Sequence, residues 1–271
     1  MFPGIDGFEW TPGHLIFLGI FYTVVAVVFL TLALAAVRAW RSYRANRAEA
    51  IRWQADFHDL PARDRACRHA LTGEMRERVC ELGFDCRRCE THARLLEERP
   101  PAQAPAADTE AGGVRLPLDR LYHRGHTWVR PEKDGTVTVG LDELASRLMG
   151  TPDRVRLPKA GRRISVNGTG WRMWKHGSDV RVLSPVDGEV AATGGPEAGW
   201  YLKVKPAEGR LDARHLLRPD EAAPWMRREL ERVQWTLGHS LADGGVMVQN
   251  LSEAVPAEAW DAVCAGVFLQ V

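Results

Sequence analysis

The sequence predicts an α+β protein in which a transmembrane helix and a helical segment precede a β-rich domain and C-terminal helices. Three patterns predict this order: an apolar uncharged run at 15–37, short β-forming runs between turn residues at 121–206, and two helical patterns after residue 219. A chain of 271 residues has room for all of these parts. We divide it into a tail with the membrane helix (1–37), a helical segment (38–98), a linker (99–113), a β domain (114–210) and a helical extension (211–271).

The apolar run at residues 15–37 is long enough to cross a membrane. It contains 23 residues, and a helix of that length spans a hydrocarbon core of about 30 Å. Trp10 and Trp40 flank the run, where the membrane–water interface favours aromatic rings. A cleaved signal peptide is the alternative, suggested by Ala33-Leu34-Ala35. The run is too long for one, however, and no basic residue precedes it.

The charges around this run predict its orientation. No Lys or Arg precedes it, whereas four arginines follow it closely: Arg38, Arg41, Arg44 and Arg47. Because cytoplasmic flanks collect basic residues, we predict a single-pass protein of the inner membrane, with its N-terminus outside and residues 38–271 in the cytoplasm. The arginines either bind anionic lipid headgroups or only set the topology, and both interpretations stay open.

Four cysteines lie within 23 residues of the segment that follows the anchor: Cys67, Cys80, Cys86 and Cys89. In a reducing cytoplasm, such cysteines indicate metal ligands or a redox pair rather than disulfides. Thiolates suit zinc or an iron–sulfur cluster, and this spacing does not separate the two. The alternative is a set of buried thiols that pack as small apolar side chains, as we expect for Cys264 on an apolar helix face.

The distance along the chain between Cys67 and Cys80 constrains a four-cysteine site. On a straight helix their positions would lie about 20 Å apart, whereas sulfurs around one metal ion lie about 4 Å apart. A four-cysteine site therefore requires a chain reversal, which we predict at Thr72-Gly73 because glycine relaxes the backbone constraint. An uninterrupted helix would leave a smaller site at the later cysteines, with His92 as a candidate ligand.

Turn residues and strand runs organise the chain beyond residue 98. Residues 99–113 are rich in Pro, Ala and Gly and predict a linker. Asp134-Gly135 between two β-forming runs predicts a hairpin, and residues 141–149 predict a short amphipathic helix. Further strands are predicted for RISV, WRMWK, VRVLS, GEVAAT and WYLKVKP. An amphipathic helix of about five turns and a second helix at Pro256–Val267 follow.

Five sequence blocks in the β region carry a family resemblance. They are YHRGHTWV at 122–129, GTVTVGL at 135–141, LPKAG at 157–161, SPVDGEV at 184–190 and GWYLKVKP at 199–206. In order and spacing, these blocks resemble the glycine cleavage system H-protein, a small lipoyl-type carrier. The resemblance covers about a third of the chain. It implies a β-sandwich of two small sheets, a barrel-sandwich hybrid, with a tight hairpin that displays a lipoylated lysine.

That lysine is where this chain departs from the family pattern. The family places it eight residues before the proline of P-V-x-G, and counting back from Pro185 gives Gly177. Lys175 lies two residues too early, and Trp171-Arg172-Met173-Trp174 replaces an acidic-serine lead-in. A shift along a strand changes the face to which a side chain points. We therefore interpret Lys175, the candidate lipoyl site, as a solvated strand residue and do not expect lipoate.

Two histidines, His123 and His126, flank the entry of the first strand of this region. We expect surface or capping roles for them rather than metal ligation. The net charge of +1 gives no indication of nucleic-acid binding, and no arrangement of nucleophile and base indicates an enzyme.

The order of the parts also resembles a group of H-protein-like bacterial proteins. They combine a cysteine segment, a carrier-like domain and a tail, here Leu241-Ala242-Asp243-Gly244-Gly245. We predict a non-catalytic docking or scaffold subunit that contacts membrane lipids through its anchor and binds a cytoplasmic or membrane protein complex. A lipoate carrier that uses Lys175 and an iron–sulfur electron-transfer subunit at the membrane are the alternatives.

Overall fold

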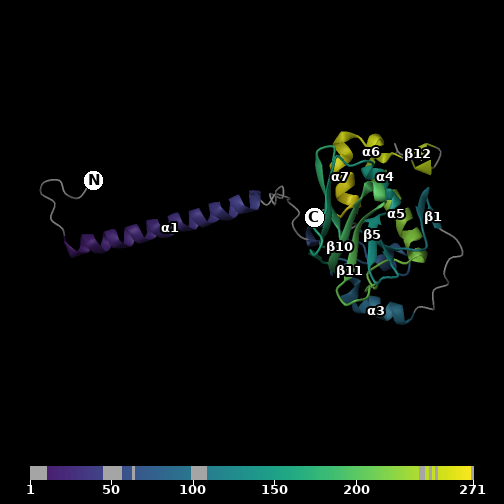
Figure 1. Ribbon diagram of the computed structural model, residues 1–271, viewed down its shortest axis with the longest axis horizontal. Helices are drawn as coiled ribbons and strands as arrows, with labels where there is room; N and C mark the ends of the chain where they lie inside the picture. The colour runs from purple at the N-terminus through teal and green to yellow at the C-terminus, as the bar shows by residue number, and fades with distance from the viewer. Residues whose placement is uncertain are drawn as a thin grey trace. The chain divides into compact units, whose positions relative to one another are not determined.

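The computed structural model describes residues 11–44, 57–62, 65–98, 109–237, 242–243, 246–247 and 250–269 (Figure 1). The chain forms two compact units, Met1–Trp53 and Gln54–Val271. The first unit contains α1 (Pro12–Arg44), and the second contains the other described helices and strands. An apolar N-terminal helix, an antiparallel β domain and C-terminal helices confirm the predicted fold class.

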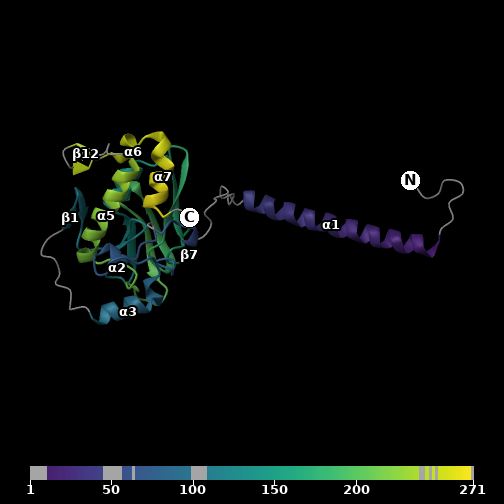
Figure 2. The ribbon, with the colours of Figure 1, turned by 180° about the vertical axis from the view of Figure 1, so that it is seen from behind.

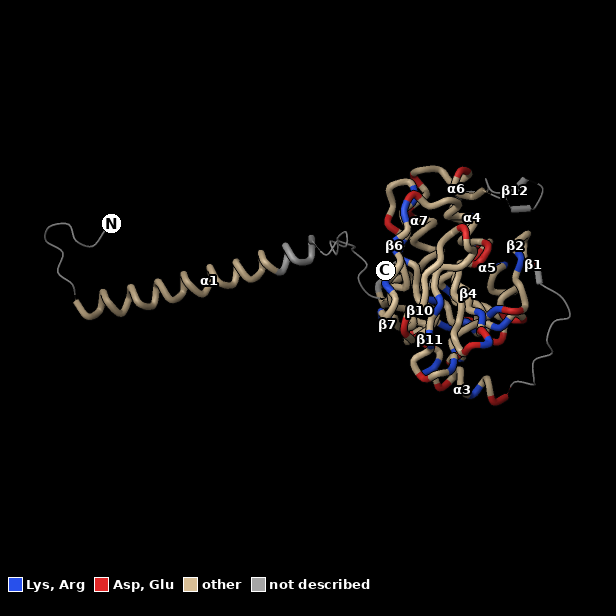
Figure 3. Tube along the Cα trace, in the orientation of Figure 1, with Lys and Arg blue, Asp and Glu red and all other residues tan. Residues whose placement is uncertain are grey.

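The helix α1 is continuous over 33 residues. Its stretch Pro12–Val37 has a mean hydropathy of 2.7 and is long and apolar enough to cross a membrane. Figure 3 shows this stretch without a charged residue. Two of the residues that flank the apolar run, Trp10 and Arg47, lie outside the described residues. Four more belong to α1, but their side chains are not described: Arg38, Trp40, Arg41 and Arg44. Orientation across a membrane therefore stays a prediction.

The β domain contains two antiparallel sheets. The larger has the order β3-β4-β5-β11-β10-β7, formed by Leu121–His123, Thr127–Pro131, Val137–Leu141, Trp200–Pro206, Gly188–Gly195 and Arg163–Ile164. The smaller has the order β6-β8-β9, formed by Arg154–Arg156, Thr169–Lys175 and Ser178–Leu183. Trp171 of β8 stacks on Tyr201 of β11 with ring centroids 4.7 Å apart. This stacked pair joins the two sheets within one apolar core.

Local sequence explains the β4–β5 hairpin of the larger sheet. Gly135 has a φ of 80°, and Asp134 Oδ1 accepts a hydrogen bond of 2.9 Å from the Thr136 amide, as expected for the predicted turn. Across the β4–β5 pair, Trp128 lies opposite Gly140. A Cβ at Gly140 would collide with the indole, so glycine at this position lets the Trp128 ring enter the core.

The helices of the second unit pack around the sandwich (Figure 2). The predicted short helix is α4 (Glu143–Met149), and it begins where Asp142 accepts a hydrogen bond from the Ala145 amide. The predicted C-terminal helices are α5 (Pro219–Leu237) and α7 (Ala257–Val267), which pack on one another, and a further turn, α6 (Leu251–Ala254), precedes α7. Two short hairpins complete this unit: β1–β2 (Thr109–Ala111 and Val114–Leu116) and β12–β13 (Ala242–Asp243 and Val246–Met247).

Parts of the predicted linker and tail lie outside the described residues. This applies to residues 99–108 and to Leu241, Gly244 and Gly245 of the tail, whereas Ala242-Asp243 form β12. The chain from Thr109 onward is already part of the β1–β2 hairpin, which packs on α5. Composition does not reveal this hairpin because its strands have three residues each and its turn is Gly112-Gly113.

The segment that carries the cysteines contains less helix than its charge-rich pattern predicts. Its described elements are η1 (Phe57–Asp59), α2 (Arg68–Leu71), η2 (Cys86–Arg88) and α3 (Glu90–Glu97). Within the helical segment predicted at 38–98, α2 has only four residues, because the chain turns back after it and pairs with itself. In both views of the second unit, α3 lies at the end opposite α6 (Figures 1 and 2).

Candidate functional site

The β8–β9 hairpin occupies the place of the predicted carrier hairpin. Its strands are in register, with Lys175 opposite Ser178, so the turn consists of His176 and Gly177. Both turn residues have positive φ, 51° and 81°, which is the conformation of a tight type I′ hairpin. The tip position eight residues before Pro185 is therefore a glycine. Lys175 is the last residue of β8 and is partly buried.

Polar and aromatic contacts fasten this hairpin to its neighbours. The Lys175 amine donates a hydrogen bond of 2.8 Å to the Thr151 carbonyl. His176 Nε2 donates to the Ser252 carbonyl of α6 at 3.0 Å, and its ring meets that of Trp260 of α7 edge-on at 4.8 Å. Ser178 Oγ is hydrogen-bonded to Asp261 of α7. The C-terminal extension thus holds the turn that would have to be free in a swinging-arm carrier.

The chain reversal between the first two cysteines is confirmed. The helix α2 ends at Leu71, Gly73 has a φ of 83°, and Ala66 pairs antiparallel with Val79. The Cys67 amide donates to the Arg78 carbonyl, and the Cys80 amide donates to the Arg65 carbonyl, each at 2.7 Å. Cys67 and Cys80 therefore lie on the two arms of one short hairpin rather than at distant points of a helix.

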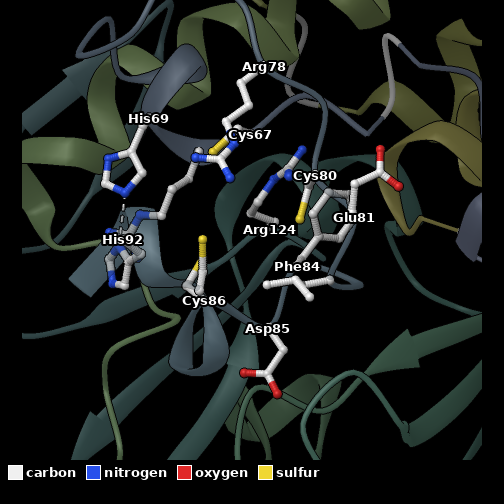
Figure 4. A pocket seen from close by; sticks show the side chains of 13 residues that line it. Cys67, His69, Arg78, Cys80, Glu81, Phe84, Asp85, Cys86, His92 and Arg124 are labelled. Atoms are coloured by element: carbon white, nitrogen blue, oxygen red, sulfur yellow. Dashed lines mark hydrogen bonds between the residues drawn. The ribbon is translucent and has the colours of Figure 1, made fainter. Parts of the chain in front are cut away.

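A cavity of about 60 Å³ brings the predicted ligands together. All four cysteines line it, joined by basic and aromatic side chains that include Arg68, His69, Arg78, Phe84, His92 and Arg124. Figure 4 shows Cys67, Cys80 and Cys86 around the same space, with the His69–His92 pair at its side. Cys86 begins η2, and Cys89 ends η2 and precedes α3, so the C-x-x-C pair lies on one tight turn.

Two buried guanidinium groups line this cavity. Arg68 forms an ion pair of 2.6 Å with the buried carboxylate of Glu221. Arg124 is 7% exposed, donates to the Ala66 carbonyl at 2.7 Å and lies 3.8 Å from the centre of the Phe84 ring. The Nε atoms of both arginines are buried without a hydrogen-bond partner. Neither arginine is among the candidates predicted from the sequence, although Arg68 adjoins Cys67 and Arg124 lies in the first family block.

Burial disfavours the charged forms of Cys86 and His92 at the cavity. Burial raises the pKa of the Cys86 thiol to about 11. Burial, together with the nearby Arg68, lowers the pKa of His92 to about 4. His69 Nε2 and His92 Nδ1 are hydrogen-bonded at 2.8 Å, and His69 Nδ1 contacts Glu74. The histidines thus bind one another and Glu74 at the edge of the cavity.

The arrangement of the cysteines tests the predicted metal site directly. Within the described ranges, no three His, Cys, Asp or Glu side chains are grouped so that they could hold one metal ion. The four cysteines nevertheless share one cavity, while Cys264 is buried on α7, outside it. Cys264 is a core residue, as expected.

Both His123 and His126 are buried, so a surface role for them is wrong, although His123 Nδ1 accepts a hydrogen bond of 3.1 Å from the Gly125 amide, as a capping side chain does. His126 Nδ1 donates a hydrogen bond of 2.7 Å to Asp142, and its Nε2 lies 3.7 Å from Glu229 of α5. Burial alone would lower the pKa of His126, but these two carboxylates outweigh it and raise the pKa to about 9. His126 is thus a buried cation that joins the β domain to two helices.

Sequence and structure comparisons place this arrangement among known proteins. The family model described as "Glycine cleavage H-protein" matches residues 120–194. The glycine cleavage system H protein of Neisseria gonorrhoeae (strain ATCC 700825 / FA 1090) is 33% identical over 105 residues, which cover 34% of this chain and 79% of that protein. The chain belongs to the glycine cleavage H-protein family.

Other relatives share the same region. The H proteins of Halorhodospira halophila (strain DSM 244 / SL1) and Azoarcus sp. (strain BH72) are 33% and 35% identical, and the matches cover 36% and 34% of this chain and 90% and 82% of the relatives. A crystal structure of the H protein from Mycobacterium marinum matches with a TM-score of 0.34 and 23% identity, covering 40% of this chain and 96% of that one. The family model and the sequence relatives therefore match the β domain, about a third of this chain.

Proposed function

We infer that this chain is a membrane-tethered H-protein-like module that carries no lipoate and serves as a docking subunit for a protein complex. The observation that carries this proposal is the β8–β9 hairpin. Gly177 occupies the position at which the family pattern places the lipoyl lysine, and the turn is fastened to α6 and α7. H-proteins are lipoyl carriers without catalytic activity of their own, so a module without the arm keeps only the binding surface.

The geometry of Lys175 argues against a carrier role. Lipoylation converts the side-chain amine to an amide, so the amine must first enter a ligase site. Here the amine donates to the Thr151 carbonyl, and the next residue is held by Ser252 and Trp260. Presentation of Lys175 would break these contacts together. A free arm would also need a lysine at the tip rather than at the end of the strand.

The apolar helix α1 supports tethering to a membrane. Its length and composition suit a bilayer, and lipids would be its partners. We expect the second unit to face the cytoplasm and to bind a cytoplasmic or membrane protein complex. With a net charge of +1, the chain lacks the bulk charge of a nucleic-acid-binding protein.

A lipoate carrier that uses Lys175 is the second candidate, and family membership favours it. Intact-mass analysis of the full chain, co-expressed with a lipoate ligase, separates the two. We expect the unmodified mass, while a lipoylated family H-protein in the same cells serves as the positive control. A lipoyl adduct that disappears in the K175R variant would overturn the docking proposal and establish the carrier.

Topology is tested with reporters fused at the C-terminus of the full chain. A reporter that works only in the cytoplasm should be active there, because the arginines after the apolar run favour the cytoplasmic side. A reporter that works only outside the cytoplasm should be silent. The opposite pattern would reject the orientation and would place the cysteines where disulfides form.

A further inference from the structure

The cysteine cavity collects four thiols from separate turns of the chain. Cys67 and Cys80 come from the two arms of the hairpin closed by the Ala66–Val79 pair. Cys86 begins η2, and Cys89 directly follows it. This segment is also anchored to the β domain, since Asn167 Nδ2 donates to the Gly83 carbonyl at 2.7 Å and Arg87 pairs with Asp187. The thiols are thus held around the cavity by contacts that do not involve sulfur.

The size of the cavity distinguishes a single ion from a larger group. A single ion bound by thiolates needs sulfurs about 4 Å apart around one point, given bonds near 2.3 Å. In the described residues, no three ligand side chains are grouped in this way. The cavity measures about 60 Å³, several times the ~15 Å³ that one water needs. Four thiols that surround such a space suit a group of several atoms, in which each metal takes its own thiolate.

The acidic residues Glu81 and Asp85 also line the cavity, so it is the buried Arg124 that favours an anionic occupant. Arg124 is 7% exposed and forms no ion pair within the described chain, although the nearby buried carboxylate of Glu229 favours its charged form. Its Nε is buried without a hydrogen-bond partner, which costs free energy unless a bound group supplies an acceptor. A cluster with four thiolate ligands carries net negative charge. Arg124 would balance that charge, whereas the charge of Arg68 is already offset by Glu221.

We propose that Cys67, Cys80, Cys86 and Cys89 bind an iron–sulfur cluster in this cavity. Iron–sulfur clusters take four cysteine thiolates, and their bridging sulfides would occupy the space that a single ion leaves open. On binding, four Sγ–H bonds break, four Sγ–Fe bonds form, and four protons leave to solvent. Preformed iron and sulfide supply the core, so no residue changes oxidation state. The cluster would make this unit a one-electron redox centre, whether or not the hairpin carries lipoate.

The test is metal and sulfide analysis of the full chain, purified in detergent without oxygen. We expect iron and acid-labile sulfide in similar amounts, with visible absorption that dithionite bleaches. C67A, C80A, C86A and C89A should each lose most of the iron and sulfide. C264A is the matched control and should retain both, because Cys264 is buried outside the cavity.

A second measurement protects the test against variants that do not fold. In the unaltered chain, alkylation followed by peptide mass analysis should leave the four cavity cysteines unmodified, and removal of iron with a chelator should expose them. Zinc without sulfide, a chain without metal, or iron and sulfide that survive in all four variants would overturn the proposal. None of these results bears on the lipoyl state of Lys175, so the two proposals fail separately.

Discussion

The β8–β9 hairpin and the cysteine cavity belong to the same compact unit, but they differ in whether their polar side chains have partners. At the turn, the partly buried Lys175 and Ser178 and the exposed His176 each have a partner outside the turn. At the cavity, the buried Nε atoms of Arg68 and Arg124 have none. Polar groups that already have hydrogen-bond partners need no ligand, whereas a ligand that pairs with an unsatisfied buried group would lower the free energy. At the family's carrier position the turn is exposed but held by neighbouring helices, whereas the cysteine segment offers buried groups that could bind a ligand.

The largest expected effect concerns the helix that closes the hairpin. W260A should lower the free energy of unfolding by about 3–5 kcal/mol, because it removes a fully buried indole. Backbone hydrogen exchange at the turn should rise, since His176 loses its ring contact. The control is W235A, whose indole is 82% exposed, with an effect below about 0.5 kcal/mol. Unchanged exchange at the turn would show that α7 does not hold the hairpin.

The pH dependence of the free energy of unfolding tests the role of the buried His126 in the unit that contains both regions. His126 has a pKa of about 9 in the folded protein, above its ordinary 6.5. Protonated His126 therefore stabilises the folded protein by on the order of 3 kcal/mol. This stabilisation is complete below pH ~6.5 and is lost as the pH rises through ~9. Thermal unfolding across this range measures the loss. D142N removes one carboxylate but retains a capping side chain, so it should flatten the dependence. An equal slope in both proteins would contradict this assignment.

The cavity cation should contribute less to stability than the closing helix does. R124M should lower the free energy of unfolding by about 2 kcal/mol, because the Ala66 carbonyl loses its donor and the ring contact with Phe84 disappears. The matched control is R120M, another arginine over an aromatic ring, which lies over Trp128 outside the cavity. We expect chemical denaturation to give less than about 1 kcal/mol for the control. Equal losses of unfolding free energy for R124M and R120M would show that Arg124 contributes no more than another arginine over an aromatic ring.

The smallest effect is expected at the hairpin lysine. K175A should change the free energy of unfolding by less than about 0.5 kcal/mol, because it removes a hydrogen bond that is exposed to solvent. H176N should cost about 1 kcal/mol, since asparagine tolerates the positive φ but cannot retain both the bond to Ser252 and the contact with Trp260. Thermal unfolding of the two variants side by side would settle the order. A larger loss of unfolding free energy for K175A than for H176N would show that Lys175 also helps to hold the hairpin.

Local patterns predicted the framework of the fold. Strand alternation and Asp134-Gly135 gave the β4–β5 hairpin, and a distance argument about Cys67 and Cys80 gave the reversal near Gly73. These features depend on residues that are neighbours in sequence or on the reach of the chain. The family resemblance, by counting back from Pro185, identified Gly177 as the residue at the carrier position.

Long-range contacts account for what the sequence did not reveal. Arg124 meets the Ala66 carbonyl across 58 residues, and His176 meets Ser252 across 76. His126 is buried because Asp142 and Glu229, from two different helices, balance its charge. No local spacing predicts such pairs. The cavity and the closed hairpin therefore become visible only when the elements are placed together.

One measurement detects both a lipoyl group on the hairpin and an inorganic cluster in the cavity. It is native mass spectrometry of the full chain, purified without oxygen from cells that also contain a lipoate ligase. The comparison predicts a polypeptide of unmodified mass that carries iron and sulfide, and it predicts that denaturation releases the inorganic mass alone. A polypeptide that carries a lipoyl group on Lys175 and no inorganic mass would contradict it. That result would show that the hairpin carries lipoate and that the cavity binds no cluster.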